Sequence, residues 1–351
     1  MLFRQLLDLR SSTFTYLLAD SAAREAVLID PVYELVSRDA ALLRELDLRL
    51  LYTVETHIHA DHVTGAWRLH NLLGSRIALS AHAGAEGADL LLRDGDVLSF
   101  GRYSLHVLST PGHTDSCLSL LTDTRDKVFT GDSLMIRAAG RTDFQQGDAR
   151  RLYRSVHDRL FSLPDDCLVY PGHDYSGRTC TSVGEEKAFN PRLGGNRSAE
   201  DFVGYMSQLG LPHPNQMAIA VPANLRCGQP EVPTAPEVGE WEPALRSFAG
   251  VLEVPPEWLV EHLREVTVVD VRTPSEYVGE LGHLAGARSI PLGQLRSELD
   301  SLPRSQRIIT VCRSGGRSAQ AFLILEKAGF PRVASLNGGM IGWHSLKLDV
   351  A

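Results

Sequence analysis

The sequence contains few cysteines, and none of them form a CxxC pair. The five cysteines among 351 residues are odd in number and scattered, which is typical of a reducing compartment rather than of a disulfide framework. We therefore expect a cytoplasmic location. No apolar run approaches the roughly 18 residues that a membrane span requires, so no membrane association is expected. Charged residues interrupt the first apolar stretch, which is interpreted as a strand rather than a secretory leader.

Positive charge is also in short supply. The 35 lysines and arginines are outnumbered by 43 aspartates and glutamates, which gives a net charge of −8. An acidic chain of this kind is unlike a general nucleic-acid binder, and no nucleic-acid partner is expected. Residues 251–351 carry 11 basic and 11 acidic side chains, so the excess of negative charge lies in residues 1–250. No single run of charge is long enough to predict disorder.

The length exceeds that of a typical single domain, and the sequence contains one natural division. Residues 228–250 include four prolines and show no sustained helix or strand period, which favours a semi-extended linker. We therefore expect a first domain over 1–227, a linker over 228–250 and a second domain over 251–351.

Apolar patterning predicts alternating strands and helices in both parts. Strands are expected at 26–30, 50–54, 104–109, 117–122, 127–130, 167–170, 266–271 and 307–311. Helices are expected at 34–46, 62–73, 148–162, 199–209, 255–264 and 318–328. Ser198 is expected to cap the fourth helix, while Gly74 and Gly329 end the second and the last.

Histidines and aspartates follow several of the predicted strands directly. The segment THIHADH after the strand at 50–54 supplies four such residues, and three later strand ends supply one each: His57, His59, Asp61 and His62, then His113, Asp132 and His173. Burying so many imidazoles and carboxylates is costly unless they bind something. Because strand ends meet at one edge of a sheet, these side chains predict a metal site for zinc, iron or manganese. No cysteine accompanies them, which argues against a structural zinc site.

This pattern, HxHxDH followed by a lone His, an Asp and a final His, resembles the metallo-β-lactamase superfamily over about residues 1–225. The resemblance implies an αβ/βα sandwich with the metal site along one edge. It also implies the ligands of the members that bind two metals. In those members one metal is held by His57, His59 and His113, the other by Asp61, His62 and His173, and Asp132 bridges them.

Two branches of that superfamily compete. Glyoxalase II enzymes hydrolyse glutathione thioesters with two metals, whereas persulfide dioxygenases oxidise glutathione persulfide with one iron. The segments at 140–148 and 171–193 resemble the persulfide dioxygenases. That resemblance implies one Fe(II) per chain, held by His57, His113 and Asp132, with open positions for persulfide sulfur and O₂. The same resemblance implies that the four remaining residues do not bind the metal but orient its ligands: His59, Asp61, His62 and His173. Read without the family, the residues favour two metals.

Three further residues are candidates for binding the glutathione part of the substrate. Arg141 matches a basic position that binds glutathione in relatives, and its planar fork suits a carboxylate. Tyr175 lies two residues after His173, where it could hydrogen-bond substrate or oxygen, or could simply pack. Lys187 is a weaker candidate, because a lysine on a helix is commonly an exposed one.

The second part carries a separate reactive loop, RIITVCRSGGRSAQAF. Cys312 ends a predicted buried strand, Gly315 and Gly316 allow the loop to curl, and a helix then begins. Backbone N–H groups, the helix N-terminus and the charges of Arg313 and Arg317 would surround the thiol. A cysteine in such a cradle is expected to have a lowered pKa and to act as a nucleophile.

This loop resembles the active site of single-domain rhodaneses, and the segments at 268–292 and 337–343 extend the resemblance over most of 251–351. It implies a small α/β domain with a parallel sheet, in which Cys312 accepts sulfane sulfur as a persulfide. Arg272 matches a position near the active loop, as does Asp270, which could instead only anchor that loop.

Both parts thus predict sulfane-sulfur chemistry. The expected protein is a persulfide dioxygenase fused to a rhodanese, which converts glutathione persulfide and O₂ to sulfite and glutathione and moves sulfur between thiosulfate and glutathione. One alternative is a binuclear glutathione thioester hydrolase with an appended rhodanese. The other is a rhodanese part that only binds sulfur carriers. A homo-oligomer remains an open expectation.

Overall fold

The computed structural model describes residues 1–230 and 244–351, and these form two compact units that divide between Pro233 and Thr234. Residues 231–243, which include most of the expected linker, lie outside the described residues. The end of that linker is different from the prediction, because Leu245–Arg246 form strand β13 and pair with Leu252–Val254 (β14). The sheet of the second unit therefore begins before residue 251.

Two six-stranded sheets make up the first unit, and they run in the orders β1-β2-β3-β4-β5-β6 and β12-β11-β10-β9-β8-β7. Their strands are β1 (Leu2–Leu7), β2 (Phe14–Asp20), β3 (Glu25–Ile29), β4 (Arg49–Val54), β5 (Arg76–Ser80), β6 (Leu90–Leu92), β7 (Val97–Phe100), β8 (Tyr103–Ser109), β9 (Leu118–Thr122), β10 (Lys127–Gly131), β11 (Leu168–Pro171) and β12 (Thr181–Ser182). The helices are α1 (Val36–Glu45), α2 (Ala66–Leu73), α3 (Ala149–Ser155), α4 (Val183–Phe189), α5 (Ala199–Met206) and α6 (Met217–Asn224).

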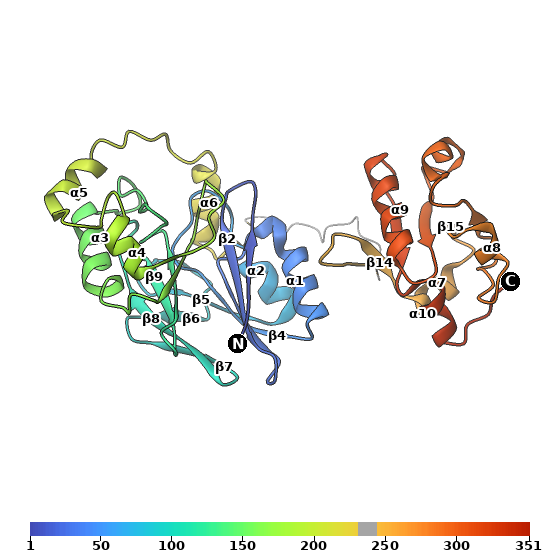
Figure 1. The fold of residues 1–351 in the computed structure, drawn as a ribbon, viewed down its shortest axis with the longest axis horizontal. Helices are drawn as coiled ribbons and strands as arrows, with labels where there is room; N and C mark the ends of the chain where they lie inside the picture. Colours follow the sequence, from blue (N-terminus) through green and yellow to red (C-terminus); the bar gives the residue numbers. More distant parts are fainter. Residues whose placement is uncertain (231–243) are drawn as a thin grey trace. The chain divides into compact units, whose positions relative to one another are not determined.

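Three apolar layers hold this unit together. Side chains such as Tyr16, Phe100 and Phe129 pack between the two sheets. The outer face of the first sheet packs against α1 and α2, and that of the second against α3 to α5. Figure 1 shows α1 and α2 on one side of the unit and α3 to α5 on the other. The arrangement is the αβ/βα sandwich that the sequence predicts.

Parallel pairing brings important strand ends together. In β3 and β4, Ile29 pairs with Val54, so the residues that follow both strands leave the sheet side by side. In β10 and β11, Gly131 pairs with Pro171 after a register shift, so Asp132 and His173 emerge next to each other. The carboxyl ends of parallel strands always meet at one edge, which places the site there.

The second unit is a six-stranded, mainly parallel sheet with helices on it, in the order β13-β14-β18-β17-β15-β16. Its remaining strands are β15 (Val266–Asp270), β16 (Arg288–Ser289), β17 (Arg307–Val311) and β18 (Val333–Leu336), and its helices are α7 (Pro256–His262), α8 (Pro274–Tyr277), α9 (Gly316–Lys327) and α10 (Gly339–Ser345). The core includes Trp343 and Phe322, both buried. This agrees with the small α/β domain that the sequence predicts.

Most predicted elements are present, with shorter bounds. Ser198 caps α5 through a capping box, and Gly74 ends α2 in the left-handed conformation, as predicted. The helix expected at 62–73 begins only at Ala66, because the residues before it form the histidine loop. The helix expected at 148–162 continues from α3 into a π-helical turn at Val156–Leu160.

Candidate metal centre and thiol site

Three of the predicted metal ligands converge in the first unit. The ligand atoms of His57, His113 and Asp132 all lie within 4.8 Å of one another, and His113 Nε2 is 3.7 Å from Asp132 Oδ2. His57 comes from the loop after β4, His113 from the loop between β8 and β9, and Asp132 from the end of β10. Two imidazoles and one carboxylate, all buried, form a donor set suited to iron, zinc or manganese.

Hydrogen bonds fix how the two ligand imidazoles are turned. His113 Nδ1 donates to the Arg141 carbonyl at 2.6 Å, which leaves Nε2 free for a metal. His57 Nδ1 lies 3.0 Å from Thr56 Oγ1, and that hydroxyl donates to Asp30 at 2.8 Å. Such outer hydrogen bonds orient metal-binding histidines and raise their basicity. A Cβ on Gly140 would lie 2.7 Å from His113 Nδ1, so this glycine allows the close approach.

The electrostatics of this group favour metal binding. Burial and the neighbouring His59 lower the pKa of His57 well below its ordinary value, and burial also lowers the pKa of His113. Burial alone would raise the pKa of Asp132, but His173 and His113 hold it below its usual range. Two neutral imidazoles and an ionised carboxylate are the protonation states that a dication requires.

His173 lies beside this group, between two carboxylates. Its Nδ1 bonds Asp132 Oδ1 at 2.8 Å and its Nε2 bonds Asp61 Oδ2 at 3.0 Å. Burial opposes the charged ring, but the two carboxylates outweigh it and raise the pKa of His173 well above its ordinary value.

A second cluster remains available. The ligand atoms of His59, Asp61 and His62 also lie within 4.8 Å of one another, and His62 Nε2 is buried without a hydrogen-bond partner among the described residues. His59 is held differently, because its Nε2 lies 3.2 Å from Asp30 and 3.6 Å from Glu55. Burial lowers the pKa of His59, but Asp30 and the other nearby carboxylates raise it to about 9.

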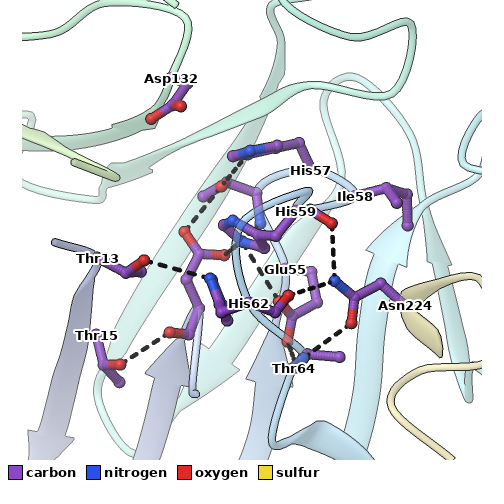
Figure 2. Close-up of polar contacts among 12 residues, drawn as sticks. Thr13, Thr15, Glu55, His57, Ile58, His59, His62, Thr64, Asp132 and Asn224 are labelled. Carbon is purple, nitrogen blue, oxygen red and sulfur yellow. Dashed lines mark hydrogen bonds and ion pairs between the residues drawn. The ribbon is translucent and has the colours of Figure 1, made fainter. Parts of the chain in front are cut away.

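A network that the sequence reasoning missed supports the histidine loop (Figure 2). Asn224, at the end of α6, donates to the His59 and His62 carbonyls at 2.9 Å each and accepts from Thr64 N at 2.8 Å. Glu55 accepts from the Thr64 hydroxyl at 2.6 Å. The signal in the sequence was present for Asn224, a lone amide within the apolar run MAIAVPAN. Asp30, noted above, is the last residue of the strand predicted at 26–30, and it directly follows the observed β3.

Two cavities lie at this end of the unit and have several lining residues in common. One of about 260 Å³ is lined by the triad, Phe144 and Arg192, and a larger one of about 660 Å³ lies beside it. Arg141 and Tyr175 line both. Tyr175 is 73% exposed and stacks on the His173 ring.

Of the predicted glutathione contacts Arg141 and Lys187, only Arg141 lines the cavities, and it lines both. Its guanidinium is held in place by both oxygens of Asp143 at 2.7 Å and by the Pro212 carbonyl. Lys187 lines neither cavity, because its amine binds Asp165 and points elsewhere. The structure therefore does not support Lys187 as a glutathione contact.

The second unit places Cys312 at the start of the predicted loop. Gly315 N donates to its sulfur at 3.2 Å, and the Ser318 hydroxyl lies 3.4 Å away. Burial opposes the thiolate, but hydrogen bonds from Ser318, Ser314 and Gly315 outweigh it and lower the pKa of Cys312. Gly315 has a φ of 106°, which a residue with a side chain rarely adopts. The predicted cradle is therefore present.

Two of the charged residues predicted near Cys312 have structural partners. Arg272 is buried, with its guanidinium bonded to both oxygens of Asp270 and to the Gly282 carbonyl. Asp270 thus anchors Arg272, and a role for Arg272 as a substrate contact stays a prediction. Arg317 is paired with Glu276, which the sequence analysis did not single out although TPSE is a capping-box pattern.

Comparison with known proteins agrees with this geometry. Residues 9–173 match the metallo-beta-lactamase superfamily and residues 255–346 match the rhodanese-like domain. The persulfide dioxygenase ETHE1 of Homo sapiens, described as mitochondrial, is 53% identical over 236 residues, which are 67% of this chain and 91% of that protein. The chain belongs to the persulfide dioxygenase family of the metallo-β-lactamase superfamily. It carries a C-terminal rhodanese domain in addition.

Solved structures lead to the same fold. The crystal structure of ETHE1 from Myxococcus xanthus is 51% identical, has a TM-score of 0.63 and covers 65% of this chain and 100% of its own. A metallo-beta-lactamase from Staphylococcus aureus covers 96% of this chain and 98% of its own with a TM-score of 0.61, and at 22% identity it shows the fold alone. Within the described residues, every helix is too short or too polar to span a membrane.

Proposed function

We propose that the first unit oxidises glutathione persulfide with O₂ to sulfite and glutathione, using one Fe(II) held by His57, His113 and Asp132. The observation that carries this proposal is the convergence of two histidines and one carboxylate, whose ligand atoms all lie within 4.8 Å of one another. Iron held by three protein ligands would supply the open positions that persulfide sulfur and O₂ both need.

The chain's own residues would then orient the substrate. Arg141 lines both cavities, and its guanidinium would bind a glutathione carboxylate in exchange for Asp143, with which it is now paired. Tyr175 lines the same two cavities and would pack against or hydrogen-bond the thiol carrier. The 260 Å³ cavity is large enough for the persulfide end of the substrate, and the adjoining larger one for the rest of the tripeptide.

The second unit, in the same proposal, transfers sulfane sulfur between thiosulfate and glutathione through a persulfide on Cys312. Its support is the hydrogen-bonded cradle around that sulfur. A cytoplasmic location and assembly as a homo-oligomer stay predictions from the sequence.

Metal analysis combined with an oxygen electrode tests the first activity. We expect one iron per chain and O₂ uptake that depends on glutathione persulfide. Two zincs per chain, with thioester cleavage and no O₂ uptake, would contradict the proposal. That result would favour the binuclear hydrolase, for which the second cluster of His59, Asp61 and His62 is the supporting observation.

Replacing Cys312 tests the second activity against a mere binding role. Removing a nucleophile typically lowers turnover by about a thousandfold or more, so we expect Cys312→Ser to abolish thiosulfate:glutathione transfer. O₂ uptake should persist. The matched control is Cys180→Ser, since Cys180 is an exposed cysteine of the first unit and does not belong to the thiol loop. Transfer that survives Cys312→Ser would contradict the assignment of the nucleophile.

A further inference from the structure

The second cation of the thiol loop is not available as a free charge. Arg317 forms a bidentate ion pair with Glu276, with both N–H···O distances at 2.7 Å. The two side chains are 36% and 31% exposed, so the pair is partly shielded from water. Within such a pair the two charges largely cancel at the distance of a bound substrate.

Glu276 is fixed by more than this arginine. Its Oε2 also accepts from the Thr273 backbone N–H and hydroxyl, each at 3.0 Å, in the capping box that starts α8. The hydrogen bonds from Arg317 lower the pKa of Glu276 to about 2. Glu276 therefore stays ionised and in place throughout the physiological pH range.

Arg313 is in the opposite situation. Its side chain is exposed, and among the described residues no carboxylate forms an ion pair with it. The formal charge that a donor meets near Cys312 is therefore the +1 of Arg313, not the +2 that the loop sequence CRSGGR suggests. The backbone N–H groups of the cradle supply only partial charges.

We propose that Glu276 is a specificity-determining residue, which neutralises Arg317 and thereby weakens the binding of anionic sulfur donors at Cys312 relative to donors of low charge. This proposal rests on the sulfur transfer proposed above. It concerns which donor chemistry the loop prefers: a dianion such as thiosulfate is disfavoured relative to an uncharged sulfane-sulfur donor.

The transfer step itself is balanced without an oxidant. The Cys312 thiolate attacks the outer sulfur of thiosulfate, a new S–S bond forms, and the bond to the sulfonate sulfur breaks. The electron pair of that bond leaves with sulfite, and Cys312 becomes a persulfide anion. The total charge of reactants and of products is −3, so the step is balanced. Because thiosulfate is a dianion, an added positive charge near Cys312 stabilises its binding.

Glu276→Gln in the full chain tests the proposal, because glutamine keeps the length and one acceptor for the cap but removes the charge. The KM for thiosulfate should fall by about two- to tenfold, with the difference shrinking at high ionic strength. Glu280→Gln is the matched control, since Glu280 is an exposed glutamate four residues away. An unchanged or higher KM in Glu276→Gln, or an equal fall in Glu280→Gln, would overturn the proposal.

Alkylation of Cys312 gives a second readout that does not require turnover. Iodoacetate and iodoacetamide differ in charge but react with the same thiolate, so their rate ratio reports the local charge and cancels any change in the cysteine pKa. We expect the iodoacetate:iodoacetamide ratio to rise in Glu276→Gln. Arg317→Gln should lower it, because Glu276 is then left unneutralised.

The double variant Glu276→Gln/Arg317→Gln discriminates most sharply. If the pair is neutral toward donors, replacing both members by glutamine should restore the wild-type ratio. If instead Arg317 binds the anion directly and Glu276 only orients it, the double variant will match Arg317→Gln, which would refute the proposal. A wild-type chain that forms no Cys312 persulfide from any donor would refute the proposed transfer itself, a separate outcome.

Discussion

The two units bring their reactive groups together in different ways. In the first, His57, His113 and Asp132 come from three separate strand ends across two sheets. In the second, the sulfur and the N–H donors that surround it lie within one short loop between β17 and α9. The metal centre therefore depends on the whole sandwich, whereas the thiol cradle depends mainly on local backbone conformation.

The two sites also differ in how deeply their charged groups are buried. The metal unit buries several ionisable groups, and each one has a partner of opposite charge or a hydroxyl close by, as His173 has between Asp132 and Asp61. Around its thiol the second unit keeps Arg313 and the Arg317–Glu276 pair partly in water, and its Arg272–Asp270 pair is buried. Buried charges cost much more when a partner is lost, so the metal unit should be the less tolerant of substitution.

The largest expected effect comes from removing a metal ligand. His57→Ala should lose bound iron and lower persulfide-dependent O₂ uptake by about a thousandfold or more, because two ligands cannot hold the metal. Metal analysis and an oxygen electrode measure both. His106→Ala, on a strand with no assigned role, is the matched control. Retained sulfur transfer through Cys312 would show that the units act separately, and retained iron in His57→Ala would contradict the ligand assignment.

Arg272→Met should produce the next largest effect, on the stability of the second unit. It leaves the buried Asp270 carboxylate without its partner, which typically costs about 3–5 kcal/mol. Urea denaturation, followed through the unfolding transition of the second unit, measures this loss of unfolding free energy. Arg296→Met, at an exposed arginine, should change stability by less than about 0.5 kcal/mol. A cost below about 1 kcal/mol for Arg272→Met would argue that Asp270 finds another partner.

Asn224→Asp should weaken iron binding without unfolding the first unit. The aspartate keeps the acceptor for Thr64 N but loses the two donors to the His59 and His62 carbonyls. Loss of such outer contacts typically lowers metal affinity about 10- to 100-fold. Competition with a chelator measures the affinity, and Asn71→Asp on α2 is the control. Equal affinities in the two variants would rule out a role for Asn224 in holding the loop.

The smallest expected effect is in the pH dependence of Cys312. Since its pKa is lowered, the alkylation rate should rise with pH through a midpoint below that of an ordinary cysteine, and should fall as pH drops through that midpoint. Ser318→Ala removes one stabilising hydrogen bond and should raise the midpoint by about half a unit to one unit. Ser335→Ala is the control, because Ser335 contacts Ser318 rather than the sulfur. A midpoint unaffected by Ser318→Ala would mean that the backbone alone stabilises the thiolate.

Much of the fold was accessible from the sequence, because strand ends marked by Gly and Pro-Gly carry the histidines and aspartates. The predicted strand at 127–130 and the predicted loop after Val311 both agree with the structure. The bounds of helices were less accurate, as at residues 62–65, because the ligand loop there uses residues whose spacing resembles a helix. Boundaries of this kind depend on tertiary contacts rather than on local preference.

The roles of the charged residues were harder to predict. Lys187 and Arg272 are basic residues in the expected segments, yet each is paired with a carboxylate of the protein itself. The sequence did not indicate a role for Glu276 or Asn224. Glu276 neutralises Arg317, and Asn224 holds the loop that carries the histidines. A sequence lists which charges exist, but only folding decides which of them pair.

The sequence by itself determined the two kinds of chemistry, since residue types such as His57 and Cys312 set what can be bound or attacked. Apolar periodicity also indicated most strands and helices locally, and the αβ/βα sandwich and the small α/β domain followed from the resemblance of the motifs to known families. Only the tertiary structure decided that His173 lies between two carboxylates and that Arg317 is neutralised by Glu276. The physical reason is that Coulomb and hydrogen-bond energies depend on distances of a few ångströms, which chain positions far apart in sequence do not reveal.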